Sequence, residues 1–188
     1  ILEIADQGDK ARMAEIYRKL AVSPGLPPIL DRVPADKRAQ LQALIEKNGL
    51  TPAQLNQMET WAVAVTLGAS MYGQMGASAD AGVENQLRNS FGNKPVSGLE
   101  TTEQQLGYFD AMPEETQRKL LVSMIDDTDT AAADFHKMVR AWSSGNTRAI
   151  ARTFDNELKK APEIADVLIG ERNANWVAWL KQRLDRPG

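Results

Sequence analysis

The sequence contains no cysteine and a single histidine, His136, among its 188 residues. The first absence excludes disulfide bonds, thiolate zinc sites and a cysteine nucleophile. The second excludes a metal site built from two or three histidines of this chain alone. His136 lies beside the apolar stripe of a predicted helix, so we interpret it as a packing or partly exposed residue.

A strongly basic run or face is also missing. The formal net charge is −3, and acidic and basic residues alternate along a chain in which 25% of the residues are charged. This distribution excludes the electrostatic footprint of a nucleic-acid-binding protein. The hydrophobic content of 43% is typical of a soluble globular domain, and the length suffices for one such domain. The composition does not indicate an oligomeric state.

Formal charge is absent from residues 60–79, a segment about long enough to cross a bilayer. The segment contains several glycines and polar side chains, which favours a buried core helix over a membrane span. No signal-peptide pattern begins the sequence, because a basic region followed by a long apolar core is missing. The first residue is not methionine, so we expect a processed chain or one piece of a longer protein.

Helical periodicity covers most of the chain. The spacing of apolar residues and the capping signals predict helices over 9–21, 35–48, 52–72, 83–90, 102–110, 113–125, 130–142, 147–160 and 162–184. Thr102 and Gln105 are predicted to form the capping pair of one of them. Short apolar stretches at 1–5 and 95–99 predict two strands.

Two isolated strands do not form an independently stable sheet. We therefore expect a mainly α-helical (α+β) fold with a small β element, and we expect further chain to complete the sheet. Residues 1–188 are interpreted as one domain that is incomplete at both ends, the helical region of a larger α/β protein.

Two glutamates lie in or at the end of the predicted strands. Glu100 ends the second strand and precedes a helix, at the edge where α/β proteins bind ligands. The partial positive charge of a helix N-terminus favours an ionised carboxylate, which a divalent metal requires. Glu3 lies between Leu2 and Ile4 and faces the opposite side of its strand. The alternatives are an ordinary helix-terminal acid at Glu100 and a solvated strand residue at Glu3.

The last helix presents a candidate partner for these acids. At about 100° per residue, with Trp176 at the centre of the buried stripe, Arg172 and Asn173 are predicted to face inward and Glu171 to face solvent. A buried arginine needs a carboxylate, because an unpaired buried charge is very unfavourable. We expect Arg172 to reach one of the two strand glutamates. It would orient the carboxylate or neutralise a substrate anion, or else form a structural ion pair.

Three segments resemble a known family. The stretch "GVENQLRNSFGNKPVSGLETTEQQLGYFDAMPEE", residues 82–115, resembles the signature region of the TraB/PrgY/GumN family, which includes the TIKI proteases. "LIGERNANWVAWL", residues 168–180, is similar to its Glu-Arg-Asn-x-x-Trp helix, and "ILEIAD" to its early strand. Glu84 stands where the family often carries an acid before a helix, although an ordinary helix-terminal acid is the simpler interpretation.

The resemblance implies a metal-dependent, peptidase-like hydrolase. Glu100, Arg172 and Asn173 would be its catalytic residues in this chain, and Glu100 and Glu3 its metal ligands. The family's two Gly-x-x-His motifs are absent here, so the histidines are expected outside these residues. The complete protein is expected to bind a divalent metal and a peptide or protein substrate, whereas this fragment is expected to bind no metal and to be inactive. Family members suggest a periplasmic or exported location, with the cytoplasm left open.

Two other interpretations remain open at this stage. The missing histidines and the many amphipathic helices are typical of a non-catalytic binding module, whose helices hold a peptide or a partner subunit. The chain could also be a stable structural fragment left by proteolysis, with no site of its own.

Overall fold

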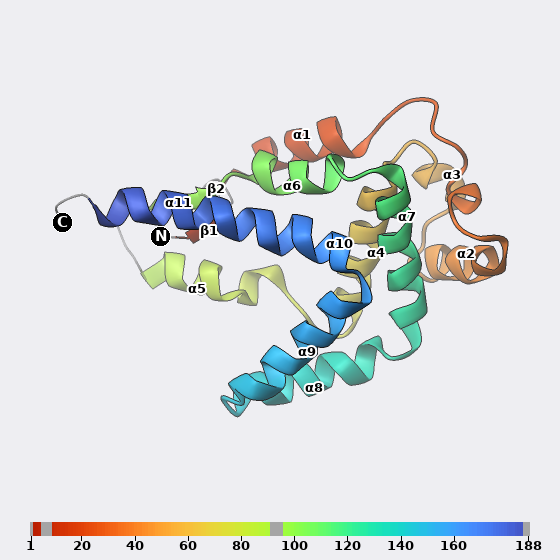
Figure 1. Ribbon diagram of the computed structural model, residues 1–188. Helices are drawn as coiled ribbons and strands as arrows, with labels where there is room; N and C mark the ends of the chain where they lie inside the picture. Colours follow the sequence, from red (N-terminus) through yellow and green to blue (C-terminus); the bar gives the residue numbers. More distant parts are fainter. Residues whose placement is uncertain (1, 5–8, 91–95, 186–188) are drawn as a thin grey trace.

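The computed structural model describes residues 2–4, 9–90 and 96–185, apart from the side chains of residues 79, 88, 89, 157, 158 and 160. It shows a largely helical chain with a small parallel sheet (Figure 1). The elements are β1 (Leu2–Ile4), α1 (Lys10–Ala21), η1 (Ile29–Arg32), η2 (Ala35–Lys37), α2 (Arg38–Lys47), α3 (Pro52–Leu55), α4 (Thr60–Gln74), η3 (Ala79–Ala81), α5 (Val83–Ser90), β2 (Gly98–Glu100), α6 (Thr102–Asp110), α7 (Glu114–Asp126), η4 (Asp127–Asp129), α8 (Ala131–Ser143), α9 (Thr147–Lys160), α10 (Pro162–Ala165), η5 (Asp166–Glu171) and α11 (Arg172–Leu184). The predicted mainly α-helical fold with a small β element is confirmed.

The charge-free helix α4 lies in the middle of the helical core. Its side chains Trp61, Val63 and Leu67 are fully buried. Val63 and Leu67 belong to a core cluster that includes Leu121 of α7 and Leu41 of α2. The prediction of a buried core helix is confirmed. In the described part of the chain, no helix combines the length and the apolar character that a membrane crossing requires.

One predicted helix is divided in two. We expected a continuous helix over 52–72, but the chain leaves helical geometry at residues 56–59, between α3 and α4. Arg32, which is only 1% exposed, donates to the backbone carbonyls of Asn56 and Met58, each at 2.5 Å. A carbonyl that is turned toward this guanidinium is lost to the hydrogen-bond ladder of a helix, so the helix ends and a new one begins.

The two strands pair in parallel, with Leu2 opposite Gly98 and Ile4 opposite Glu100. Leu2 and Ile4 are buried, while Glu3 faces the other side and is half-buried, as the alternation of a strand requires. The second strand begins and ends later than the predicted 95–99. The outermost residues of the predicted first strand, and the start of the second, lie outside the described residues.

The C-terminal helical region runs along the strands. It was predicted as one helix over 162–184, but a π-helical segment, η5, separates α10 from α11. Figure 1 shows α11 passing beside β1 and β2. The two preceding helices, α8 and α9, lie side by side as a hairpin at the lower edge of the view. This path places the beginning of α11 against the two strands that carry the glutamates.

Candidate functional site

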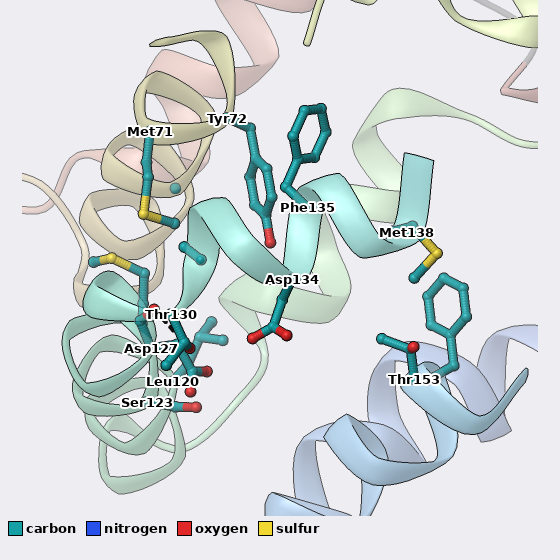
Figure 2. A pocket seen from close by; sticks show the side chains of 14 residues that line it. Met71, Tyr72, Leu120, Ser123, Asp127, Thr130, Asp134, Phe135, Met138 and Thr153 are labelled. Carbon is teal, nitrogen blue, oxygen red and sulfur yellow. Dashed lines mark hydrogen bonds between the residues drawn. The ribbon is translucent and has the colours of Figure 1, made fainter. Parts of the chain in front are cut away.

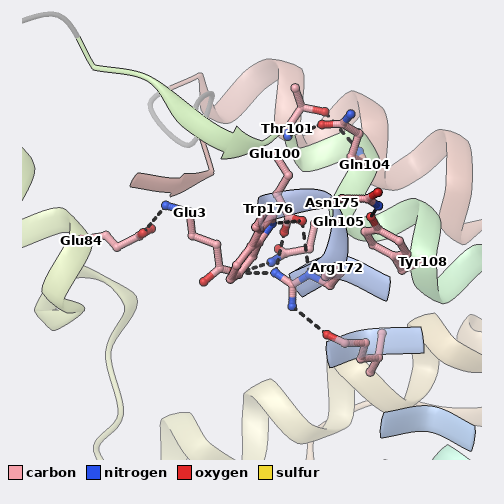
Figure 3. A network of polar contacts seen from close by, with 11 residues as sticks. Glu3, Glu84, Glu100, Thr101, Gln104, Gln105, Tyr108, Arg172, Asn175 and Trp176 are labelled. Carbon is pink, nitrogen blue, oxygen red and sulfur yellow. Dashed lines mark hydrogen bonds and ion pairs between the residues drawn. The ribbon is translucent and has the colours of Figure 1, made fainter. Parts of the chain in front are cut away.

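Glu3 of β1, Glu100 of β2 and Arg172 of α11 form one cluster of charged side chains (Figure 3). Nη2 of Arg172 donates to Oε1 of Glu3 and, at 2.5 Å, to Oε1 of Glu100. Nε of Arg172 donates to the second oxygen of Glu100 at 3.3 Å. The predicted contact between this arginine and the strand glutamates is confirmed. Because Glu100 is buried, the guanidinium supplies the positive charge that its carboxylate needs.

Trp176 completes the surroundings of Glu100 from one turn further along α11. Its indole Nε1 donates to Oε2 of Glu100 at 3.1 Å. The guanidinium carbon of Arg172 lies 4.9 Å from the centre of the Trp176 ring, a cation–π distance. The sequence identified Trp176 as the centre of a buried stripe and as the tryptophan of the Glu-Arg-Asn-x-x-Trp resemblance, but not as a partner of Glu100. The i, i+4 spacing from Arg172 was the signal that the two side chains lie together.

Gln105 holds Glu3 from the first turns of α6. Its amide donates to Oε1 of Glu3 at 2.8 Å. We predicted that Gln105 would cap the helix with Thr102, but the capping box is Thr101 with Gln104. The helix begins one residue earlier than that pair requires, since the Thr101 hydroxyl accepts from the backbone of Gln104 at 3.2 Å. Gln105 is thereby left to face the sheet.

Glu84 links the first turn of α5 to β1. Its carboxylate accepts a hydrogen bond from the backbone N–H of Glu3 at 2.5 Å. The expected position in the first turn of a helix is confirmed. The contact with the strand could not be read from the sequence, because it joins residues 81 positions apart.

Asn173 does not face the cluster. It is exposed, so the prediction that it points inward is wrong. The half-buried side of α11 is a narrow stripe made of Arg172, Trp176, Trp179 and Leu180. At about 100° per residue, Asn173 falls just beyond the edge of that stripe. The neighbouring amide of Asn175 instead donates to the Tyr108 hydroxyl of α6 at 2.8 Å.

The charges of the cluster do not cancel. Burial lowers the pKa of Arg172, but its hydrogen bonds with Glu100 and Glu3 and their negative charges outweigh this effect and raise the pKa above the ordinary value. The cluster therefore favours the charged form of Arg172. Two carboxylates against one guanidinium leave one formal negative charge, which favours a further cation at this edge of the sheet.

The carboxylate oxygens of Glu3 and Glu100 are of the type that binds a divalent metal, but two carboxylates are too few to hold one. Carboxylate oxygens are ligands that hard and borderline cations accept. Here Arg172 lies against both carboxylates, and each oxygen of Glu100 already accepts a hydrogen bond. In the described ranges, no group of three or more histidine, aspartate or glutamate side chains is placed to hold a metal ion. His136 is exposed on α8, as expected, and takes no part in the cluster.

Comparisons with known proteins agree on one family. The TraB/PrgY/gumN family model matches residues 1–188. Two curated relatives, both printed as "Uncharacterized protein YbaP", come from Escherichia coli strain K12 and Shigella flexneri. Each is 24% identical over 152 residues, which cover 78% of this chain and 55% of the relative. The chain thus spans about half the length of the curated relatives it matches. No solved structure matches it significantly.

Proposed function

The chain belongs to the TraB/PrgY/gumN family, and from this we propose that the complete protein is a metal-dependent hydrolase that acts on peptide bonds. This chain would supply Glu100, Glu3 and Arg172. The observation that carries the proposal is the convergence of two strand glutamates on one arginine and one indole N–H. By this resemblance, we expect the histidine ligands to come from Gly-x-x-His motifs, which residues 1–188 do not contain. The resemblance also supports a periplasmic or exported location, which stays a prediction.

In this proposal the two glutamates have different parts. Glu100 is buried and held by three hydrogen bonds, so it is the fixed oxygen ligand. Glu3 is more exposed and turns toward or away from the metal. The metal, when bound, lowers the pKa of its water and polarises the peptide carbonyl.

Arg172 and Trp176 act as positioning residues. The guanidinium fixes the orientation of the Glu100 carboxylate and the ring of Trp176 holds the guanidinium. An arginine N–H that is released when Glu3 turns away can bind a carboxylate or carbonyl oxygen of the substrate. Asn173 is proposed as a substrate contact on the exposed side of α11.

The test is metal binding and peptide hydrolysis by the full-length protein with Glu100→Gln. Titration with Mn²⁺, Co²⁺ and Zn²⁺ should show binding to the wild type that weakens at least tenfold in the variant, because an ionised ligand is lost. Hydrolysis of a mixed peptide library should fall by two orders of magnitude or more. Glu103→Gln is the matched control, since Glu103 is exposed and pairs only with Lys19 among the described contacts. A folded Glu100→Gln protein with wild-type metal affinity and hydrolysis would refute the proposal.

A non-catalytic binding module is the second candidate, and one observation favours it. The α8–α9 hairpin exposes large apolar side chains, among them Val139, Trp142 and Phe154. Soluble proteins bury most such side chains, and exposed groups of them mark contact surfaces. If full-length protein hydrolyses no peptide but retains one from the library through this hairpin, the binding module is the better account.

A further inference from the structure

A pocket of about 410 Å³ lies among α4, α7, α8 and α9, four helices that contribute nothing to the glutamate–arginine cluster (Figure 2). Its apolar lining consists mainly of methionine and aromatic side chains. Met71 and Tyr72 come from α4, Met124 from α7, Phe135 and Met138 from α8, and Phe154 from α9. A volume of this size is at the lower end of the range that holds small organic ligands.

The apolar lining favours an aromatic ring over an alkyl group of the same size. Tyr72 and Phe135 contact each other with ring centres 5.8 Å apart, and Phe154 adds a third ring from α9. Aromatic rings that pack on one another gain more than the area they bury provides. The thioether sulfur of methionine also contacts rings favourably, and its flexible side chain adapts to the shape of a ligand. An aromatic ligand uses both kinds of contact, whereas an alkyl group offers neither.

The charged groups of the lining are already engaged. Asp127 and Asp134 both have interaction partners, and Lys137 pairs with Asp134 at 3.2 Å. Among the described residues that line the pocket, none is a lysine, arginine or histidine. A ligand of either charge would give up its hydration for a mainly apolar surface without gaining a partner of its own. The pocket therefore favours a neutral ligand.

The Tyr72 hydroxyl is the polar group that a neutral ligand can use. In the part of the chain that the structure describes, it makes no hydrogen bond, and Figure 2 shows it turned toward the interior of the lining side chains. A tyrosine hydroxyl both donates and accepts, so it can bind a hydroxyl or a carbonyl group. Tyr72 is 46% exposed, so water competes for this contact and its contribution to affinity is modest.

We infer that this pocket binds a small neutral aromatic molecule that carries one hydroxyl or carbonyl group. The ring of the ligand lies against the methionine and aromatic side chains, and its polar group meets the Tyr72 hydroxyl. The site is separate from the proposed hydrolytic one, and neither proposal depends on the other.

The experiment compares four probes of similar size: benzyl alcohol, cyclohexylmethanol, benzylammonium and benzoate. Binding to the full-length protein is measured by two-dimensional NMR titration, which requires neither metal nor hydrolysis. We expect benzyl alcohol to bind at least about threefold more tightly than cyclohexylmethanol and at least about tenfold more tightly than either ion. The largest shifts should fall on α4, α8 and α9. The inference is overturned if benzyl alcohol does not bind, if cyclohexylmethanol or either ion binds as tightly, or if the shifts fall elsewhere.

Two variants test the proposed contacts, and a third is their control. Phe154→Ser should weaken benzyl alcohol binding at least about fivefold, because one ring of the lining is lost. Tyr72→Phe keeps the ring and removes the hydroxyl, so it should weaken binding about threefold. Trp142→Ser should leave the affinity unchanged, since Trp142 lies on the same hairpin outside the lining. Phe154 and Trp142 are 57% and 66% exposed, so both serine variants fold. A benzyl alcohol affinity that neither Phe154→Ser nor Tyr72→Phe changes overturns the inference.

Discussion

Replacing Arg172 by methionine tests the physical basis of the glutamate–arginine cluster. Methionine keeps an unbranched side chain beside Trp176 but removes the charge that faces Glu100 and Glu3. The Glu100 side chain is 4% exposed, so water cannot replace the lost guanidinium. The variant therefore keeps a buried carboxylate whose only remaining side-chain donor in the described contacts is the Trp176 indole.

The size of the effect follows from the exposure of the three side chains. Removing one partner of a fully buried ion pair destabilises a protein by about 3–5 kcal/mol. The Arg172 side chain is 14% exposed and that of Glu3 is 39% exposed, so only the Glu100 half of the cluster approaches full burial. We expect the lower end, about 3 kcal/mol. For a chain of 188 residues, this lowers the melting temperature by about 6–12 °C.

Calorimetry and urea unfolding measure the change, with Arg183→Met as the matched control. Arg183 lies on the exposed side of the same helix, so its substitution should change the melting temperature by less than about 2 °C. The double variant Arg172→Met/Glu100→Gln should recover part of the lost stability, because it removes the uncompensated charge. A melting temperature that is unchanged in Arg172→Met, or a double variant as unstable as the sum of the two single variants, would refute the reasoning.

Three further predictions concern the scaffold. Arg32→Met should lower the free energy of unfolding by about 3 kcal/mol in urea titration, because three backbone carbonyls lose their buried donor; a loss below 1 kcal/mol contradicts this. The pKa of Glu163 is lowered by a hydrogen bond from its own backbone N–H and by the hydrogen bond and charge of Lys119. Its stabilising effect is therefore present above its ordinary pKa of 4.5 and is lost as the pH falls through the lowered value. The melting temperature of Glu163→Gln should lie below that of the wild type at pH 7 and equal it at pH 2. A difference in melting temperature that does not change with pH would contradict the stabilising effect of the Glu163 carboxylate. Thr101→Ala removes the side-chain cap on Gln104 and should destabilise by about 1 kcal/mol, whereas Thr101→Ser should not.

Two features of the candidate site could be predicted because the signal for each lies within one short segment of the sequence. The junction at Glu100 could be read because a strand residue, a threonine cap and a helix follow one another directly. The pairing of Arg172 with an acid followed from burial alone, since an inward-facing guanidinium needs a carboxylate wherever it lies. Each conclusion needed only the few residues around Glu100 or around Arg172, and not the identity of a distant partner.

The features that the sequence did not reveal depend on distant contacts. The break between α3 and α4 is caused by the guanidinium of Arg32, which lies 24 residues before Asn56, the first residue of the break whose carbonyl it binds. The capping box uses Gln104, so Gln105 lies one position further along the helix, about 100° around its axis, where it contacts Glu3. The pocket near Asp134 is assembled from four helices, none of which shows a cavity in its own periodicity.

Arg172 makes stability and cation binding compete at the same atoms. A cation that displaced the guanidinium from both carboxylates would have to offset about 3 kcal/mol, which lowers its apparent affinity by about two orders of magnitude. If only Glu3 turns away, the buried contacts of Glu100 are kept and the loss is that of a partly exposed pair, about 1 kcal/mol or less. The energetically accessible route therefore keeps Arg172 on Glu100 and moves Glu3. For this reason the proposed metal site has one fixed and one mobile carboxylate, and Arg172 works as a positioning residue in it.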